Sequence, residues 1–327
     1  MKNRNCGGGC NDAAGVKSAK CNARCREALQ RSRRDLILAE LKSIQREYQE
    51  KRFAFVSSGR MRPILATLGA TDEDLDGLKA TSDNLAPDPT LSFRKSKNGR
   101  FMLDMDASVV RRLEFQPFVL SAAEGFVRHD SGQLRRFRGI QDDLQSNTAF
   151  QALIRFKAFV TSGVDVNPRP MVDVSSKKLV TTVFHLRTVT NQSDIGHPAI
   201  EGVHSDGVEH TMTTFVGSEN MRQDSAVSLI LNNAHPNGVS FHDVDKQLVL
   251  GAAQHQDPFD TLLIADSERK HAVSEVFAKD PEKPATRDML VVFTRHPFVE
   301  GHPTYPFDSL KGHQEIPLEF PLGFDLE

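Results

Sequence analysis

The segment EGVHSDGVEH, residues 201–210, places an imidazole and a carboxylate two positions apart, at His204 and Asp206, directly before Gly207. The surrounding sequence is typical of β-strands. Because successive side chains of a strand point to opposite faces, residues at positions i and i+2 share one face. We therefore expect His204 and Asp206 to converge on one point, where they could ligate a metal ion.

His271, in TLLIADSERKHAVSEV, is the candidate third ligand because it comes just after an apolar segment that we expect to be a buried strand. It lies 65 residues after Asp206, which leaves room for the strands that bring two strand ends face to face in a barrel. Two histidines and one carboxylate leave coordination positions open, as in non-haem Fe(II) oxygenases, where oxygen and an organic cosubstrate share the ion. Spacing alone leaves open whether these residues are ligands or solvated side chains.

Arg287 opens the later segment TRDMLVVFTR, which we expect to be a strand. A guanidinium there could hold the far carboxylate of a dicarboxylic cosubstrate in a bidentate pair, although it could equally be solvated. A second His-x-Asp pair, His255 and Asp257 in QHQDPF, stands beside Pro258 and only one strand before His271. We expect that pair to lie in a turn and not to bind a metal.

His185 and Arg187, in VFHLRTV, are also two positions apart and therefore share one face of a predicted strand. They could bind a substrate carboxylate or the cosubstrate. They could equally form a structural hydrogen-bonded pair or face the solvent, and the pattern does not decide between these interpretations.

The composition limits the classes of protein that this chain can represent. Of its 327 residues 39% are hydrophobic, which is enough for a sizeable core, and the 41 Lys and Arg nearly balance the 43 Asp and Glu, so that no nucleic-acid partner is indicated. There is no apolar run of about 18 residues and no signal peptide, so we expect a soluble, cytoplasmic protein with no membrane partner. Neither a Gly-x-Ser-x-Gly elbow nor a Gly-rich phosphate loop between a strand and a helix is present, and this argues against a serine hydrolase and a nucleotide-binding enzyme.

All cysteines lie in the first 25 residues, as two Cys-x3-Cys pairs: Cys6, Cys10, Cys21 and Cys25. Such pairs could hold zinc or form disulfides, but the spacing differs from the common Cys-x2-Cys and no apolar residues accompany it. We expect residues 1–30 to be a poorly ordered segment whose role stays open. The absence of cysteine from the rest of the chain suits a reducing compartment.

The remaining sequence predicts a single, mainly β domain at 31–327 with flanking α-helices. Its helical and mixed supporting part spans 31–160 and its β core about 161–300. In the supporting part we expect a helix at 32–53, a strand in FAFVSS, a helix near 71–80, a turn-rich segment at 84–101, and helices and loops at 108–160. In the core we expect an antiparallel sandwich or barrel built from the strands 178–190, 211–217, 226–232, 238–244, 261–266 and 288–294.

Four motifs in this order and spacing, HLRTVT, EGVHSDGVEH, LLIADSERKHAV and TRDMLVVFTR, carry a family likeness. From about residue 178 to 296 the chain resembles the bacterial and fungal 2-oxoglutarate/Fe(II) dioxygenases that act on free amino acids, the isoleucine 4-hydroxylase group, and the upstream sequence matches more loosely. The resemblance implies a double-stranded β-helix (a jelly roll, cupin-like), with iron on His204, Asp206 and His271 and 2-oxoglutarate on Arg287.

The same resemblance implies an oxygenase that uses Fe(II), 2-oxoglutarate and O2 to oxidise an unactivated C–H bond of a free aliphatic L-amino acid, releasing succinate and CO2. Hydroxylation is the default outcome, while fungal relatives in secondary metabolism close an aziridine ring from valine. We expect Arg187 to bind the substrate carboxylate. The chain departs from the family at Ala272, where a glycine is usual, and in NMRQDSAVS, which lacks paired glycines. Both departures border the pocket and bear on substrate choice.

Two other classes remain as alternatives. A metal-free jelly-roll binding protein would keep His204, Asp206 and His271 apart. A cupin-like metal enzyme without 2-oxoglutarate would leave Arg287 away from the metal or facing the solvent. The sequence does not indicate the oligomeric state, the particular amino acid or the carbon that is attacked.

Overall fold

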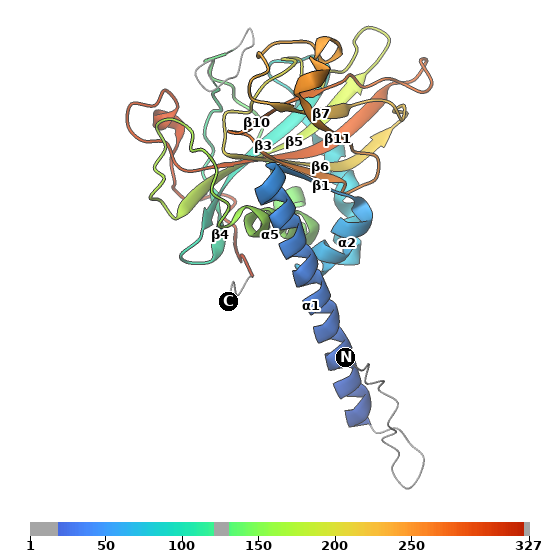
Figure 1. The fold of residues 1–327 in the computed structure, drawn as a ribbon, viewed down its shortest axis with the longest axis vertical. Coiled ribbons are helices and arrows are strands. Elements are labelled where there is room, and N and C mark those ends of the chain that lie inside the picture. Colours follow the sequence, from blue (N-terminus) through green and yellow to red (C-terminus); the bar gives the residue numbers. More distant parts are fainter. Residues whose placement is uncertain (1–18, 121–130, 324–327) are drawn as a thin grey trace.

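The computed structural model describes residues 19–120 and 131–323, which form two β-sheets with helices on one side (Figure 1). The helices are α1 (Ala19–Lys51), α2 (Ser58–Thr67), α3 (Asp72–Gly77), α4 (Asp142–Gln145) and α5 (Thr148–Thr161), with 3-10 turns at η1 (Leu78–Asn84), η3 (Phe241–Asp243), η4 (Lys246–Leu248) and η5 (Tyr305–Phe307). The strands are β1 (Phe53–Val56), β2 (Ala86–Pro87), β3 (Arg94–Asp104), β4 (Val109–Leu113), β5 (Lys178–Thr190), β6 (His210–Glu219), β7 (Val227–Asn232), β8 (Val249–Gln254), β9 (Thr261–Ala265), β10 (Arg269–Val273), β11 (Ala285–Arg295) and β12 (Glu319–Pro321).

The main sheet has the strand order β1-β9-β6-β11-β5-β3-β4-β12, with β2 paired to β3, and the small sheet has the order β10-β7-β8. Neighbouring strands run antiparallel in both sheets. Ile230 and Ala253 of the small sheet pack with Leu262 and Ile264 of β9 in one buried cluster, so the two sheets face each other. This is the mainly β architecture with flanking helices that the sequence predicts.

The two faces of the main sheet have different roles. On β11, Leu290 and Val292 belong to the large core under the helices, whereas Arg287, Met289 and Val291 line a cavity between the sheets. This alternation follows from the two-residue period of a strand. One face of the main sheet therefore builds the core and the other builds the candidate site.

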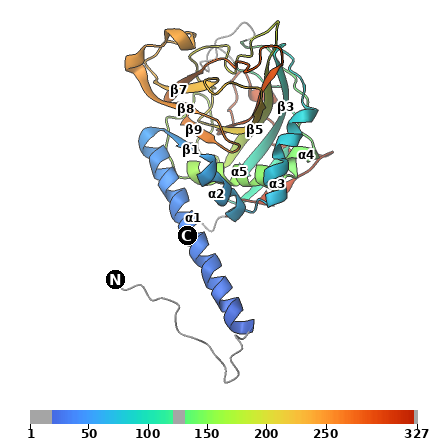
Figure 2. The same ribbon diagram turned by 90° about the vertical axis from the view of Figure 1, so that its right-hand side faces the viewer.

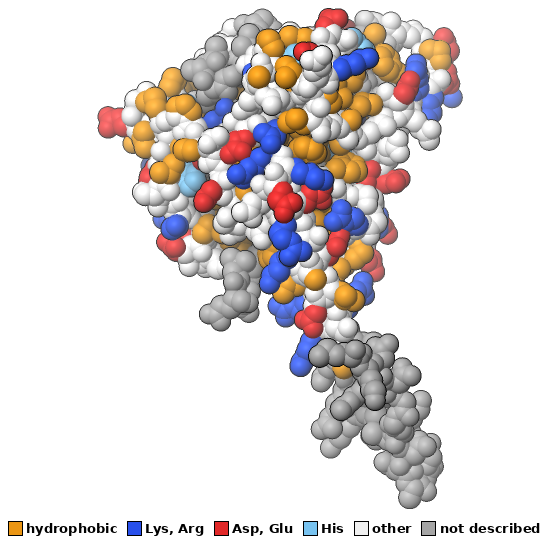
Figure 3. All heavy atoms as spheres, viewed as in Figure 1, with side chains coloured by type: hydrophobic (Ala, Val, Ile, Leu, Met, Phe, Trp, Pro, Cys, Tyr) orange, Lys and Arg blue, Asp and Glu red, His pale blue; other side chains and the backbone are white. Residues whose placement is uncertain are grey.

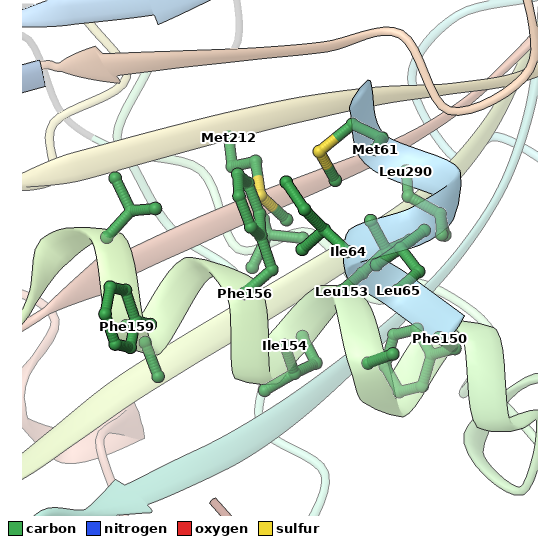
Figure 4. Close-up of a cluster of buried hydrophobic side chains, with 14 of the residues drawn as sticks. Met61, Ile64, Leu65, Phe150, Leu153, Ile154, Phe156, Phe159, Met212 and Leu290 are labelled. Atoms are coloured by element: carbon green, nitrogen blue, oxygen red, sulfur yellow. The ribbon is translucent and has the colours of Figure 1, made fainter. Parts of the chain in front are cut away.

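Helix α5 is the centre of the core layer. Asn147 caps its first turn, where the side-chain oxygen accepts hydrogen bonds from the N–H groups of Ala149 and Phe150. The helix is buried on nearly every side because it lies between the sheet and the helices α1 and α2. Figure 4 shows side chains of α5 and α2 meeting Met212 of β6 and Leu290 of β11. This packing supports the strands from the helix side, opposite the face that lines the candidate site.

Helix α1 is longer than the sequence predicts. It begins at Ala19, inside the segment expected to be poorly ordered, so that Cys21 and Cys25 belong to the helix while Cys6 and Cys10 lie outside the described residues. Figures 1 and 2 show its first half projecting away from the body.

The second half of α1 packs on the core. Leu41, Ile44 and Tyr48 are buried, whereas Leu36 is 69% exposed. The rest of the protein therefore covers the apolar side chains of the last three turns of the helix.

Some predicted segments are wrong. The segment 84–101, expected to be turn-rich, contains most of β3, a strand with buried polar side chains that pairs with β5 along its whole length. Residues 238–244, expected to be a strand, form a loop with the turn η3, and their apolar side chains pack beneath the small sheet. Strands β4, β8, β10 and β12 were not predicted, and β4 lies in the segment 108–160, where helices and loops were expected. Because β1 and β3 join the main sheet, that sheet also draws strands from the part expected only to support it.

No helix within residues 19–120 and 131–323 combines the length and the apolar character that crossing a bilayer requires. On the face drawn in Figure 3, Lys and Arg side chains lie among Asp and Glu side chains instead of gathering in a patch of one sign. The mixed surface agrees with the net charge of −2.

Candidate active site

The structure brings together the three side chains that the sequence singles out. The ligand atoms of His204, Asp206 and His271 lie within 4.8 Å of one another, and all three residues are buried. The Nε2 atom of His204 is 3.5 Å from Oδ1 of Asp206, and Nε2 of His271 is 3.7 Å from Oδ2 of the same carboxylate. The predicted convergence is therefore present in the fold.

The local reason for this convergence differs from the predicted one. His204 and Asp206 lie in a loop before β6 and not on a regular strand. The loop is fixed by one isolated bridge, in which His204 pairs with His271 of β10. It turns at Gly207, whose φ of +76° is a left-handed conformation that glycine adopts without strain. The glycine after the His-x-Asp motif thus makes the turn that aims Asp206 back at the histidines.

His204 is oriented by its own loop. Its Nδ1 donates a hydrogen bond to the carbonyl oxygen of Gly202 at 2.8 Å, because a carbonyl can only accept. In the neutral ring the lone pair is therefore on Nε2, which faces Asp206. Gly202 has a φ of +69°, and a Cβ there would lie 2.3 Å from the carbonyl oxygen of Val239, so no larger residue fits. The Nδ1 of His271 is buried and has no hydrogen-bond partner among the described residues.

Burial and mutual proximity shift the pKa values of the three groups in different directions. Burial alone would lower the pKa of His204, but the hydrogen bond and the charge of Asp206 raise it to about 9. Burial and the nearby His204 lower the pKa of His271 to about 4. The two imidazoles hold the pKa of Asp206 well below its usual range in spite of burial. A divalent cation would replace the proton between His204 and Asp206, since ligands must be deprotonated.

Arg287 faces the same cavity from β11. Its side chain is buried and forms no ion pair within the part of the chain that the structure describes, and its Nε has no hydrogen-bond partner there. Burial lowers the pKa of Arg287 to about 10. An uncompensated buried guanidinium is costly, and an anionic ligand would offset that cost. Thr213 and Ser228 line the same cavity, which measures about 150 Å³.

The other lining residues were missed from the sequence. Charged residues from three loops and from β3 line the cavity: Asp88, Arg135 and Glu201 from the loops, and Arg94 from the start of β3. An aromatic wall completes it, with Phe118, Phe137, Phe184 and Phe293 packed as one cluster. The strand period could have found Phe293, because it shares a face of β11 with Arg287. No local signal marks the residues that come from loops.

His185 and Arg187 are not brought to this cavity. The ring of His185 is hydrogen-bonded to the hydroxyl of Ser82 at 2.8 Å, and burial lowers the pKa of His185 to about 4. Arg187 forms a bidentate ion pair with Asp288 at 2.7 and 2.8 Å. Even-numbered residues of β5, such as Phe184, face the cavity, so the odd-numbered ones face away. His185 and Arg187 do share one face of β5, as expected, but that face points away from the cavity.

The alternatives predict other geometries. A metal-free binding module would leave His204, Asp206 and His271 apart, but their ligand atoms converge. A cupin without 2-oxoglutarate would leave Arg287 remote or solvated, but it is buried against the same cavity. The donor set of two imidazoles, one carboxylate and a nearby unpaired guanidinium fits Fe(II) with a dicarboxylate cosubstrate. His255 and Asp257 lie in the turn after β8, as predicted.

The sequence of the chain matches known proteins over most of its length. The family model described as 2OG-Fe dioxygenase matches residues 79–293. The bifunctional enzyme flvA of Aspergillus flavus is 39% identical over 287 residues, which is 88% of this chain. The chain spans only about a third of that relative, 35% of its length.

Solved structures extend the comparison. The Fe(II)/α-ketoglutarate-dependent dioxygenase TqaL is 42% identical and superposes with a TM-score of 0.77, covering 89% of this chain and 98% of its own. A BsmA homologue from Methylobium petroleophilum, at 19% identity and a TM-score of 0.62, covers 78% of this chain and 93% of its own, and shares the fold. These likenesses confirm the predicted jelly-roll fold class. They also confirm, at the level of the family, the predicted oxygenase with Fe(II), 2-oxoglutarate and O2.

Proposed function

The chain belongs to the 2OG-Fe dioxygenase family, and from that premise we propose that it oxidises an unactivated C–H bond of a free aliphatic L-amino acid. In this proposal His204, Asp206 and His271 hold Fe(II), and Arg287 binds the far carboxylate of 2-oxoglutarate. The observation that carries the proposal is the convergence of the three ligand atoms within 4.8 Å beside a cavity that also contains a buried, unpaired Arg287.

When bound, Fe(II) would allow O2 to act as the oxidant, taking two electrons from the substrate C–H bond and two from 2-oxoglutarate, which leaves as succinate and CO2. The chain itself supplies orientation. His204 presents Nε2 because Gly202 holds its Nδ1, and Asp206 is held through its Oδ2, which accepts a hydrogen bond from the hydroxyl of Thr211 at 2.7 Å. Arg287 fixes one end of the cosubstrate in a buried, low-dielectric setting where a charge-assisted pair is strong.

The charges around the cavity favour a zwitterionic substrate. Among the described residues the lining contains three cations and three carboxylates: Arg94, Arg135, Arg287, Asp88, Glu201 and Asp206. The two charges of Fe(II) and the two of 2-oxoglutarate cancel. A substrate with no net charge therefore keeps the buried site neutral, which avoids the cost of an uncompensated buried charge. A free amino acid meets this requirement with one carboxylate and one ammonium.

We assign the substrate contacts to residues other than Arg187. Arg94 and Arg135 supply positive charge for the carboxylate, and Asp88 and Glu201 supply negative charge for the ammonium. The aromatic cluster around Phe118 encloses the aliphatic side chain. The amino-acid class itself rests on the resemblance carried by the motifs around residues 204, 271 and 287.

Oxidation of the substrate has two candidate outcomes, hydroxylation and ring closure. Hydroxylation is the default and adds one oxygen atom. Oxidative ring closure, such as aziridine formation from valine, removes two hydrogen atoms and depends on the amine lying close to the oxidised carbon. Glu201 lines the same cavity as His204 and His271. An ammonium held by Glu201 would therefore be close to the reaction centre, which keeps ring closure open.

The test is to incubate the Fe(II)-loaded protein with 2-oxoglutarate and single free L-amino acids, and to measure succinate and product mass. We expect succinate formation to rise with an aliphatic amino acid, together with a product heavier by one oxygen or lighter by two hydrogens. A protein that binds Fe(II) and 2-oxoglutarate but shows no stimulation by any aliphatic amino acid would contradict the substrate class. His271→Ala is the control for metal-dependent turnover.

A further inference from the structure

The turn that carries Asp206 is held from behind by a second carboxylate, Asp266. Its Oδ1 accepts a hydrogen bond from the N–H of Asp206 at 2.8 Å, and its Oδ2 accepts one from the N–H of Val208 at 3.2 Å. These two N–H groups flank Gly207, with its φ of +76°. Backbone N–H groups arranged around such a residue form a nest that binds anions. Here the anion is supplied by the protein itself.

Arg169 completes the arrangement from the loop that follows α5. Its Nε donates to the carbonyl oxygen of Val208 at 2.7 Å, and its Nη2 donates to both the main-chain oxygen and Oδ2 of Asp266, at 2.7 and 2.5 Å. One guanidinium therefore joins the ligand turn to the carboxylate that binds it. Asp266 is fully buried, so these contacts exchange little with solvent.

Asp266 also connects the two segments that supply ligands. It stands directly after β9, in the turn that leads into β10 and His271. Its own N–H donates to the carbonyl oxygen of Glu209 at 2.9 Å. The turn at residues 206–208 is thus attached at both ends to the β9–β10 hairpin, which carries His271. Neither Asp266 nor Arg169 lines the cavity, so neither contacts substrate or cosubstrate there.

We propose that Asp266 and Arg169 are positioning residues that set the metal-binding geometry of Asp206 through the backbone of the 206–208 turn. This inference rests on the proposed function, in which Asp206 is an iron ligand. Without the Asp266 carboxylate, the N–H groups of Asp206 and Val208 lose their hydrogen-bond acceptors. The 206–208 turn then shifts away from its native conformation. Residues that orient metal ligands in this way typically change metal affinity by about 10–100-fold.

The test uses Asp266→Asn, which keeps the shape of the side chain but places an amide NH2 group against N–H donors. We expect anaerobic Fe(II) titration to show a dissociation constant about 10–100-fold weaker than that of the wild type. At saturating Fe(II), the affinity for 2-oxoglutarate should stay within about twofold, because Arg287 is untouched.

Asp288→Asn is the matched control, because Asp288 is also fully buried and also paired with an arginine, Arg187, but on the helix side of the sheet. It should lower the melting temperature and leave the Fe(II) affinity unchanged. If Asp266→Asn does not fold, Arg169→Lys, which loses the Nε contact to Val208, should give the same selective loss of Fe(II) affinity. Wild-type Fe(II) affinity in both Asp266→Asn and Arg169→Lys, or an equal loss in Asp288→Asn, would overturn the positioning role. A wild-type protein that itself binds no Fe(II) would instead overturn the proposed function.

Discussion

The main chains of His204 and His271 form a reciprocal pair, in which the N–H of each donates to the carbonyl oxygen of the other at 3.0 Å. The two residues are 67 positions apart, and this bridge joins the loop before β6 to the middle of β10. The backbone therefore sets the separation of the two imidazoles. Replacing either side chain removes a proposed ligand but keeps the bridge, so such variants test coordination without unfolding the protein.

Replacement of Arg287 by Gln should weaken cosubstrate binding selectively. A hydrogen bond to a charged group contributes about 1.5–3 kcal/mol, so we expect the KM for 2-oxoglutarate to rise by about 10–100-fold. The matched control is Arg187→Gln, on the opposite face of the sheet, for which the same KM should change by less than about twofold. Steady-state kinetics at saturating Fe(II) measures both. An unchanged KM in Arg287→Gln would remove this residue from the cosubstrate site.

Replacement of Arg135 by Gln should act on the amino acid instead. Arg135 lines the cavity with its guanidinium over the ring of Phe118, 5.0 Å from the centroid. Loss of its charge should raise the KM for the amino acid by about tenfold or more and leave the KM for 2-oxoglutarate near the wild-type value. Equal increases in both constants would show that Arg135 supports the fold of the pocket and not the substrate.

Replacement of Gly207 by Ala should loosen the metal site. A residue with a side chain at a φ of +76° costs about 1–2 kcal/mol, and relief of that strain would rotate the peptide next to Asp206. We expect a weaker Fe(II) affinity in anaerobic titration calorimetry. Gly163→Ala is the control, since Gly163 has a φ of +68° and a Cβ added there would meet no atom of the described residues within 4 Å. Similar Fe(II) affinities in the two variants would contradict the account of the turn.

His185 should make stability depend on pH. Its pKa falls from 6.5 to about 4 on burial, so the unfolded state binds the proton more readily than the folded state. The contribution is fully present above pH 6.5 and is lost as the pH falls through about 4. Between pH 7 and pH 5 the wild type should lose about 2 kcal/mol more unfolding free energy than His185→Gln, as measured by urea denaturation.

The same His185→Gln variant tests the interpretation, left open by the sequence, that His185 binds the substrate. Because His185 faces Ser82 and the helices, the KM for the amino acid should stay close to that of the wild type at neutral pH. A large rise in that KM without a loss of stability would return His185 to the substrate site.

Strands with two apolar faces, or with one apolar and one polar face, could be predicted from the sequence. The segment 178–190 is β5 itself, because its Val, Thr and Phe residues fit a pleated surface packed on both sides. Strand β3 could not be predicted, since Arg94–Asp104 is polar over its first half and is held by pairing with β5. Residues 238–244 have the apolar pattern of a strand because Val239, Phe241 and Val244 are partly buried beneath the small sheet. Within residues 19–120 and 131–323 they belong to neither sheet.

The candidate ligands could be predicted because each is a chemically distinctive residue near a strand. The face of β5 could not be predicted, since a one-residue shift of register exchanges its two sides. That is why Arg187 was expected in the pocket and Phe184 was not. Residues such as Arg135, Glu201 and Asp266 reach the site from loops, where sequence periodicity gives no information on direction.

The most direct test of the central claim is anaerobic addition of Fe(II) and 2-oxoglutarate to the full chain, followed by visible absorption spectroscopy. Chelation of Fe(II) by 2-oxoglutarate on a two-histidine, one-carboxylate site gives a weak metal-to-ligand charge-transfer band. We predict this band in the wild type and its absence in His271→Ala, whose main-chain bridge to His204 is preserved. No band in the wild type at saturating Fe(II) and 2-oxoglutarate, or an undiminished band in His271→Ala, would contradict the assignment of the site.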